Sequence, residues 1–334
     1  MAVYTHLGAD QFAALITEYD VGELVSVKGI AEGVSNSNWL VETTGSDGAL
    51  DSAGNPQTRF ILTMYERRID LDDLPFFLGL LDHLSAKDGP VPRTIHDRTG
   101  NASRTLDGKA IALIEFLPGV SIENPTEAQA KAVGAALAGI HLASADFADT
   151  RKNDLRPVDW QKLFDQCGDH LAEIDPALPG IISQHMPRLL SEWPEDLPHS
   201  TIHADLFPDN VLMLGNEVTG LIDFYFACTD ITAYDLAVTH AAWCFGDLGT
   251  VFRPEIGAAM MAGYESVRPL SDAELSALPL LAQGAAMRFA ATRAFDWINT
   301  PDDALVKRKD PMDFMKRLEF YAEHGHTAFR RRAI

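Results

Sequence analysis

Two short segments constrain the fold of this 334-residue chain more than any others. The first is His203-Ala-Asp-Leu-Phe-Pro-Asp-Asn210, and the second is Ile222-Asp-Phe224. Between them, two apolar runs within 211–222 flank a Gly-Asn-Glu sequence, which predicts a β-hairpin. Such a hairpin would place Asn210 and Asp223 opposite each other at its open end.

The side chains of this set meet the needs of phosphoryl transfer from a nucleotide. Asp205 is a carboxylate that can orient a hydroxyl nucleophile. Asn210 and Asp223 supply an amide oxygen and a second carboxylate, and hard oxygen ligands of this kind suit Mg²⁺. The two segments therefore predict the active site of a kinase, with Asn210 and Asp223 holding both the metal and its nucleotide.

A metal-dependent hydrolase is the alternative interpretation of the same region. It would use His199, His203 and Asp205 as ligands. The helical frame of an H-E-x-x-H type site is missing, and Pro198 predicts that His199 lies in a loop. The kinase interpretation is favoured.

Composition limits the partners and the compartment. A hydrophobic content of 46% over this length allows two domains, each with a real core. The formal charge of −21 argues against nucleic acid or an anionic membrane as a partner. Three scattered cysteines indicate reduced thiols, and no segment has the pattern of a signal peptide or the length of a membrane span. We expect a soluble cytoplasmic protein.

The chain changes character at Pro118-Gly119, a natural hinge. Before it, apolar runs predict strands at 23–27, 37–43, 59–65 and 109–117, with helices at 10–20 (Asp10 as N-cap) and 74–84. After it, amphipathic stretches predict helices at 160–175, 180–193, 231–246, 255–267, 272–298 and 311–323, and Thr126 with Gln129 forms a capping box.

This pattern predicts an α+β, bilobal protein-kinase-like fold. Residues 1–117 would form a small nucleotide-binding lobe with an antiparallel sheet and the hinge strand, and residues 118–334 a larger, mainly helical lobe for catalysis and substrate binding. The polar segment 45–58 is expected to be an exposed, mobile hairpin loop.

Residues of the first lobe are candidates for binding the nucleotide. The segment 28–38, between two predicted strands, has glycines that let backbone amides approach phosphates. The candidate phosphate contacts are Gly33, Ser35, Asn36 and Asn38. The backbone near Glu115 and Leu117 would face the adenine ring. Thr63 occupies the strand position where kinases usually carry a phosphate-binding lysine, and no replacement for that lysine is assigned.

Segments that resemble those of a known protein family are spread over nearly the whole chain. They are 33–39, 62–66, 74–81, 115–119, 203–210, 222–224, 234–237, 242–245 and 288–297. Through them the chain resembles the aminoglycoside-phosphotransferase/choline-kinase-like superfamily of small-molecule kinases. Within that superfamily it looks like the bacterial homoserine kinases of the phosphotransferase-like type, which is consistent with threonine at position 63.

The resemblance implies transfer of the ATP γ-phosphate to the side-chain hydroxyl of L-homoserine, a step of threonine biosynthesis. It makes Asp205 the catalytic base, His203 a residue that orients the catalytic loop, and Asn210 and Asp223 the Mg²⁺ ligands. Asp235 would anchor the catalytic loop through backbone hydrogen bonds, although an aspartate at the start of a helix is also stabilised without such a role.

Homoserine carries a carboxylate and an ammonium, so its pocket needs a cation. Arg293 is the candidate, and a structural Arg–Asp pair with Asp296 is the alternative for it. Other acceptors of the superfamily stay open, namely choline, ethanolamine, an aminoglycoside or hydroxylysine. The missing lysine leaves a nucleotide-binding pseudokinase as a further alternative.

Overall fold

The structure, a computed structural model, describes residues 7–30, 36–51, 54–66, 70–246, 249–300 and 308–329. The chain divides into two compact units, Met1–Pro118 and Gly119–Ile334. The boundary expected after residue 117 differs from this division by one residue. An antiparallel sheet in the first unit and helices through most of the second confirm the predicted α+β class.

The first unit is built around one antiparallel sheet. Its strand order is β1-β2-β3-β6-β4, and β5 pairs with β6. The elements are α1 (Ala9–Ile16), β1 (Leu24–Ile30), β2 (Asn36–Thr43), β3 (Arg59–Tyr65), α2 (Leu74–Ser85), β4 (Thr94–Ile95), β5 (Arg104–Leu106) and β6 (Lys109–Glu115). Because side chains alternate along a strand, Trp39 and Val41 of β2 point to one face of the sheet and Asn38 to the other.

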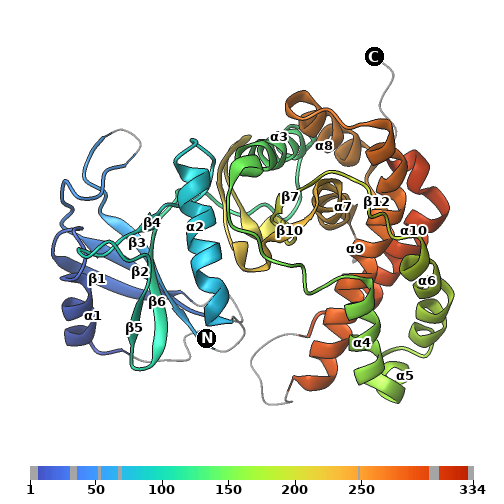
Figure 1. Ribbon diagram of the computed structural model, residues 1–334, viewed down its shortest axis with the longest axis horizontal. Helices are drawn as coiled ribbons and strands as arrows, with labels where there is room; N and C mark the ends of the chain where they lie inside the picture. Colours follow the sequence, from blue (N-terminus) through green and yellow to red (C-terminus); the bar gives the residue numbers. More distant parts are fainter. Residues whose placement is uncertain are drawn as a thin grey trace. The chain divides into compact units, whose positions relative to one another are not determined.

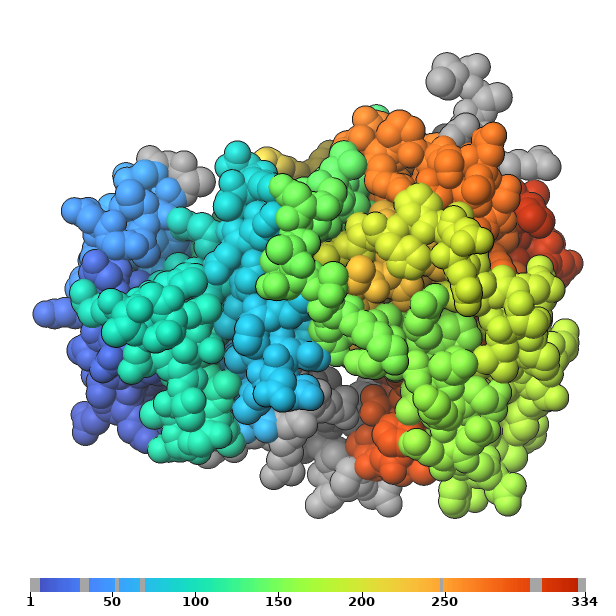
Figure 2. Space-filling model, in the orientation of Figure 1, coloured from blue at the N-terminus to red at the C-terminus, as the bar shows by residue number. Residues whose placement is uncertain are grey.

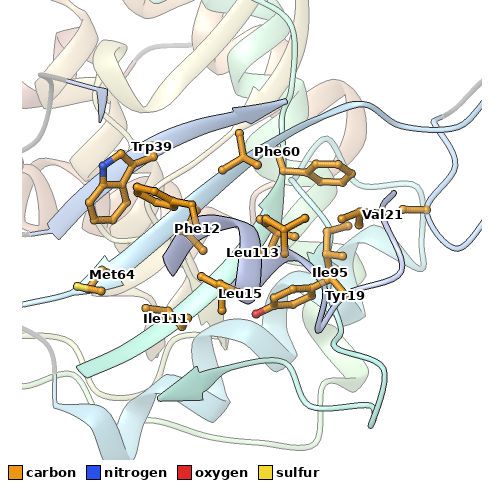
Figure 3. Packing of buried hydrophobic residues seen from close by; sticks show 14 residues of the cluster. Phe12, Leu15, Tyr19, Val21, Trp39, Phe60, Met64, Ile95, Ile111 and Leu113 are labelled. Carbon is orange, nitrogen blue, oxygen red and sulfur yellow. The ribbon is translucent and has the colours of Figure 1, made fainter. Parts of the chain in front are cut away.

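Helix α1 closes the core of the first unit. Figure 3 shows Phe12 and Leu15 of this helix among the buried side chains of the sheet. Phe12 meets Trp39 edge to face, with ring centroids 5.5 Å apart. The predicted N-cap at Asp10 was wrong. The cap is Gly8, because its N–H donates to the Gln11 side chain at 2.9 Å.

Most described residues of the segment 45–58 are exposed, as expected, but part of the segment is packed against the unit. Ala49 and Gln57 are buried, and Leu50 forms an isolated β-bridge with Pro56. The Gln57 amide donates to the carbonyls of Arg59 and Phe116, at 3.0 and 3.4 Å. These backbone contacts fix the described part of the segment; residues 52–53 lie outside it.

The second unit is mainly helical. Its helices of eight or more residues are α3 (Glu127–Ala143), α4 (Pro157–Cys167), α6 (Leu178–Glu192), α7 (Thr232–Trp243), α8 (Pro254–Val267), α9 (Asp272–Asn299) and α10 (Met312–Ala328), and α5 (Leu171–Ile174) is shorter. Its paired strands are β7 (His199–Ile202) with β10 (Cys228–Ile231), β8 (Val211–Leu214) with β9 (Glu217–Leu221), and β11 (Phe245–Gly246) with β12 (Val251–Phe252). None of the helices in the described ranges is long and apolar enough to cross a membrane.

Helix α7 is the centre of the second unit. Every one of its residues is buried, and it packs against α3, α8, α9 and the β7–β10 pair (Figure 1). Helices α4, α5 and α6, by contrast, form part of the surface, where Figure 2 shows them in green to yellow. Because α7 has no solvent-facing side, its polar residues Asp235 and His240 must find their partners inside the protein.

Helices α3 and α9 of the second unit begin at capping boxes. In α3, Thr126 and Gln129 exchange side-chain and backbone hydrogen bonds, which confirms the predicted cap. In α9, Ser271 and Glu274 do the same, at 3.2 and 2.9 Å. These caps satisfy N–H groups that a helix start otherwise leaves without partners.

Candidate active site

The β8–β9 hairpin brings the two motif segments together. Val211 pairs with Leu221, and the turn begins at Gly215 with φ +62°. Beyond the paired strands, the Ile222 N–H donates to the Asn210 carbonyl at 3.0 Å. Asn210 is therefore the neighbour of Ile222 across the hairpin. Asp223 is the next residue, so the pairing of Asn210 with Asp223 that the sequence predicted is displaced by one residue.

The loop that follows β7 carries the candidate base, and Asp235 of α7 holds its backbone. Asp235 accepts the N–H groups of His203 and Ala204, each at 2.7 Å. Ala204 has φ +63°, a left-handed conformation that an alanine adopts only against a steric cost. The anchoring role predicted for Asp235 is confirmed by these two bonds.

Asp235 also receives a side chain from α3. His141 Nε2 lies 2.9 Å from the Asp235 carboxylate, and His141 Nδ1 lies 2.8 Å from the Tyr264 hydroxyl. Burial acts to raise the pKa of Asp235, but the hydrogen bond from His141 and those from the loop outweigh it, so the pKa is lowered. Asp235 therefore stays ionised and keeps accepting the loop's N–H groups.

His203 links the two motif segments from a fully buried position. Its Nε2 lies 2.9 Å from the Ile222 carbonyl, and its Nδ1 accepts the Asp205 N–H at 3.2 Å. Both contacts suit one neutral tautomer with hydrogen on Nε2. Burial lowers the pKa of His203, against the charges of Asp235 and Asp205, so the ring remains neutral.

Asp205 lies where the loop turns toward η4 (Pro208–Asn210). The Asn210 amide nitrogen donates to the Asp205 carbonyl at 2.8 Å and is 3.4 Å from its Oδ2. Burial raises the pKa of Asp205, and the nearby Arg288 guanidinium opposes the rise. The Asp205 side chain is 18% exposed, so a substrate hydroxyl can approach its carboxylate.

Asp223 ends the hairpin in a left-handed conformation, with φ +67° and ψ +57°. Burial, together with the charges of Asp205 and Asp209, raises its pKa to about 7. A divalent cation beside Asp223 would offset the repulsion from these charges. Because the amide nitrogen of Asn210 is used by Asp205, its amide oxygen is the atom suited to a metal. These residues fit Mg²⁺.

The metal-hydrolase alternative finds no support in the geometry. His199 is the first residue of β7 and not part of a loop, which corrects the expectation from Pro198. Its Nε2 lies 3.9 Å from Asp230, while the His203 ring bonds to Ile222. Within the part of the chain that the structure describes, no three His, Cys, Asp or Glu side chains gather to hold a metal.

Comparison with known proteins identifies the family of the chain. Residues 26–270 match the sequence model of the phosphotransferase enzyme family. The chain belongs to this family. It is 48% identical to a homoserine kinase of Acidiphilium cryptum (strain JF-5), covering 98% of this chain and 99% of the relative. A homoserine kinase of Gluconobacter oxydans (strain 621H) is also 48% identical, over 98% and 100% of the two chains.

Solved structures share the phosphotransferase fold. A spectinomycin phosphotransferase in complex with ADP and spectinomycin has a TM-score of 0.71 at 13% identity, covering 96% of this chain and all of the other. A choline kinase from Cryptosporidium parvum Iowa II has a TM-score of 0.57 at 13% identity, over 90% and 89%. At this identity the likeness concerns the fold, and it bears out the predicted kinase-like class.

Two residues of this phosphotransferase site were not assigned from the sequence. Arg288 of α9 is 2% exposed, donates through Nη1 to the Ala204 carbonyl and lies 3.8 Å from Asp205. His141 of α3 holds Asp235. Each is a lone charged or titratable residue in an apolar helical run, such as Gly-Ala-Ala-Met-Arg-Phe-Ala-Ala around Arg288. That isolation was the available signal, because a buried polar group needs a partner.

Arg293 lies one turn after Arg288 on α9, and its partners come from the chain around α10. Its Nη1 donates to the Asp310 carbonyl at 2.9 Å and lies 3.4 Å from the Asp313 carboxylate. The guanidinium also lies 4.6 Å from the ring centroid of Phe314. Burial lowers the pKa of Arg293, and Asp313 opposes the change. The geometry thus provides a structural ion pair, and the substrate role remains a proposal.

The candidate nucleotide contacts belong to the first unit. Gly33 and Ser35 lie outside the described residues. Asn36 is 5% exposed, and its side-chain oxygen has no hydrogen-bond partner. Asn38 accepts the Thr63 hydroxyl at 2.8 Å. Both asparagines point away from the α1 core, to the opposite face of the sheet.

The adenine-side candidates lie at the end of β6. Glu115 forms a two-point ion pair with Arg93, at 2.9 and 3.0 Å, so its side chain has a structural partner. Leu117 is half-buried. The contact expected for these residues uses backbone groups, and it stays a prediction.

Thr63 occupies the middle of the sheet, 3% exposed, between Asn38 on β2 and Ala112 on β6. A lysine–carboxylate pair is present nearby, between Lys109 at the start of β6 and Glu66 after β3. It lies toward the end of β3, away from the central position where a kinase lysine was sought. The phosphate-binding lysine therefore remains unassigned.

Proposed function

We propose that this protein transfers the γ-phosphate of ATP to the side-chain hydroxyl of L-homoserine, forming O-phospho-L-homoserine and ADP. The 48% identity to curated homoserine kinases over nearly the whole chain carries this proposal. The loop that holds Asp205 supports the reaction type, because a carboxylate held on a fixed backbone is the requirement for orienting a hydroxyl nucleophile.

The reaction follows from the residues at the β8–β9 hairpin. The homoserine oxygen forms a bond to the γ-phosphorus while the bond from that phosphorus to the β–γ bridging oxygen breaks. The hydroxyl proton passes to Asp205. The carboxylate of this residue is partly exposed, so the substrate hydroxyl can reach it. His203 keeps the base in place through its contacts with the Asp205 N–H and Ile222.

Asn210 and Asp223 would hold Mg²⁺, which when bound neutralises charge on the phosphates. The proximity of the two residues across the hairpin supports this assignment, as do the charges of Asp205 and Asp209 near Asp223. Asn36 and Asn38, with Gly33 and Ser35, are the proposed phosphate contacts of the first unit, and the backbone at Glu115 and Leu117 is proposed for adenine.

Arg293 is the proposed partner of the homoserine carboxylate. Its guanidinium is close enough to Asp205 for the two charges to interact, and it belongs to the same helix as Arg288. A cation near the base suits an acceptor that carries a carboxylate, whereas choline carries none. The partner of the homoserine ammonium is not assigned.

The proposal is tested with purified protein, ATP and Mg²⁺ against L-homoserine, choline, ethanolamine, hydroxylysine and kanamycin. ADP release and mass spectrometry of the acceptor are measured for each compound. We expect a phosphorylated product from homoserine, with kcat/KM at least 100-fold above that of the other acceptors. Faster turnover of another acceptor would replace homoserine, and nucleotide binding without any product would indicate a pseudokinase.

A further inference from the structure

Arg288 is a buried cation that touches the catalytic loop at two points. Its Nη1 donates to the carbonyl of Ala204, and its Nη2 lies 3.8 Å from Oδ1 of Asp205. The other carboxylate oxygen of Asp205 is the one nearer to Asn210. The guanidinium and Asn210 therefore flank the proposed base from two sides.

The same guanidinium reaches the segment that carries the proposed metal ligand. It lies 5.2 Å from the ring centroid of Phe226, in the short helix η5 (Phe224–Phe226) directly after Asp223, and 4.5 Å from the ring of Phe289 on its own helix. One side chain of α9 thus contacts both the loop of the base and the loop of the metal ligand.

Ala204 explains why this contact matters for geometry. Its N–H is held by Asp235 and its carbonyl by Arg288, so an anion and a cation fix the two peptide groups that flank a left-handed alanine. The left-handed conformation is unfavourable for an alanine, because its Cβ crowds the following carbonyl oxygen. Loss of the carbonyl contact would let the peptide between Ala204 and Asp205 rotate, and the carboxylate would move with it.

The surroundings of Arg288 make a purely structural role costly. It lies in an alanine-rich stretch of α9 in which the neighbours from Gln283 to Ala291 are all buried. Its Nε has no hydrogen-bond partner in the structure. An apolar side chain would fill this place without a desolvation cost, because a buried charge is stabilising only when fully paired.

We propose that Arg288 is a positioning residue for phosphoryl transfer: it fixes the Ala204–Asp205 peptide and the Asp205 carboxylate in register with the segment that follows Asp223. This inference rests on the proposed function, since it assigns Arg288 to the same site. Arg288 acts on the base and not on the nucleotide or the acceptor, so its removal lowers kcat and leaves both KM values near their original values.

Arg317 provides a matched control. It is also a buried arginine of the second unit, 9% exposed, with Nη1 donating to the Ala241 carbonyl and Nε without a partner. Its guanidinium lies 4.2 Å from the ring of Phe314 and 5.4 Å from that of Phe245. Arg317→Met therefore removes a buried, ring-stacked guanidinium that does not contact the catalytic loop.

The test compares Arg288→Met, Arg288→Lys and Arg317→Met. We expect Arg288→Met to lower kcat by about 100-fold, the size of effect that a displacement of about 1 Å produces, with KM values changed less than threefold. Arg288→Lys keeps a cation and one donor, and should recover about tenfold. Arg317→Met should lower the melting temperature with kcat within threefold. Equal kcat losses in the two Met variants, or an ATP KM that rises with kcat unchanged, would overturn the proposal.

Two further measurements separate this inference from the proposed function. In an Asp205→Asn background, Arg288→Met should reduce the residual turnover by less than twofold, because the arginine acts through Asp205. Amide hydrogen exchange at residues 204–206 should become at least tenfold faster in Arg288→Met and stay unchanged in Arg317→Met. The hydrogen-exchange measurement requires no phosphate acceptor. An inactive wild type would refute the homoserine assignment alone, whereas unchanged exchange would refute the positioning role alone.

Discussion

Two residues of the candidate site have a strained, left-handed backbone. Of the described non-glycine residues, four have positive φ, and two of these, Ala204 and Asp223, belong to the site. An aspartate tolerates this conformation through its own short polar side chain, whereas alanine depends on outside support. For Ala204 that support comes from Asp235 and Arg288, residues distant in the sequence. Strain of this kind persists where the surroundings over-determine it.

Asp205→Asn is the direct test of the base. The amide keeps the size of the carboxylate but cannot accept the hydroxyl proton, so kcat should fall by about 100-fold or more. Binding of ATP, measured by isothermal titration calorimetry, should change by less than threefold. Turnover that remains within threefold of the wild type would remove Asp205 from the role of base.

Arg293→Lys tests the proposed carboxylate contact. A lysine keeps the charge but loses the planar, two-point geometry of the guanidinium, so the KM for homoserine should rise about tenfold. The KM for ATP should stay within twofold. If both KM values rise together, the ion pair with Asp313 is the whole role of this arginine.

At the scale of elements, close helix packing determines where the loops of the second unit are held. Helices α3 and α8 approach so closely that a Cβ on Gly134 would lie 2.2 Å from the Met260 carbonyl oxygen. A Cβ on Gly263 would lie 1.9 Å from the Lys131 carbonyl oxygen. This contact places His141 of α3 beside Tyr264 of α8, and so sets the partner of Asp235.

Gly263→Ala should therefore destabilise the protein. The added methyl would overlap a backbone oxygen, so we expect a loss of about 1–3 kcal/mol in the free energy of unfolding, measured by urea denaturation. Gly139→Ala is the control in α3, because nothing lies within 4 Å of a Cβ there, and it should stabilise by about 0.5–1 kcal/mol. Equal effects of the two changes would contradict the close contact.

At the scale of the whole molecule, buried histidines couple folding to pH. His240 of α7 is fully buried, its Nδ1 lies 2.6 Å from the Tyr321 hydroxyl, and its Nε2 has no hydrogen-bond partner. Burial lowers its pKa to about 3. His203 is also held neutral by burial. The folded protein therefore takes up fewer protons than the unfolded chain in mild acid.

The sign of the pH effect follows from His240. Its folded pKa lies below the unfolded value of about 6.5, so the contribution to stability is complete above pH 6.5 and is lost as the pH falls toward 3. The slope from this residue is about 1.4 kcal/mol per pH unit. His240→Gln should show a shallower fall in unfolding free energy between pH 6.5 and 5. Parallel curves for the two proteins would show that His240 titrates normally.

Much of the candidate site could be predicted because its residues lie close together in the sequence. The spacing of Asp205, Asn210 and Asp223 around an apolar hairpin is a local pattern, and the ladder of β8 and β9 realises it. The two-residue Gly215-Asn216 turn between paired Leu214 and Glu217 is itself a local feature. Most helix positions were predictable for the same reason, since capping boxes and apolar periodicity act within a few residues. The single helix predicted at 160–175 was wrong, because the chain there is divided into α4 and α5 around Gly168.

Tertiary structure decided the contacts between residues that lie far apart in the sequence. Arg288 contacts Ala204 of the catalytic loop, which is 84 residues away in the sequence. His141 contacts Asp235, which holds the same loop and is 94 residues away. The sequence determined an α+β kinase-like chain and predicted the candidate base and metal ligands, because those predictions depend on local motifs. Only the packed protein determined which buried charges hold that loop, because a charge in an apolar interior must take the partner that the fold brings to it.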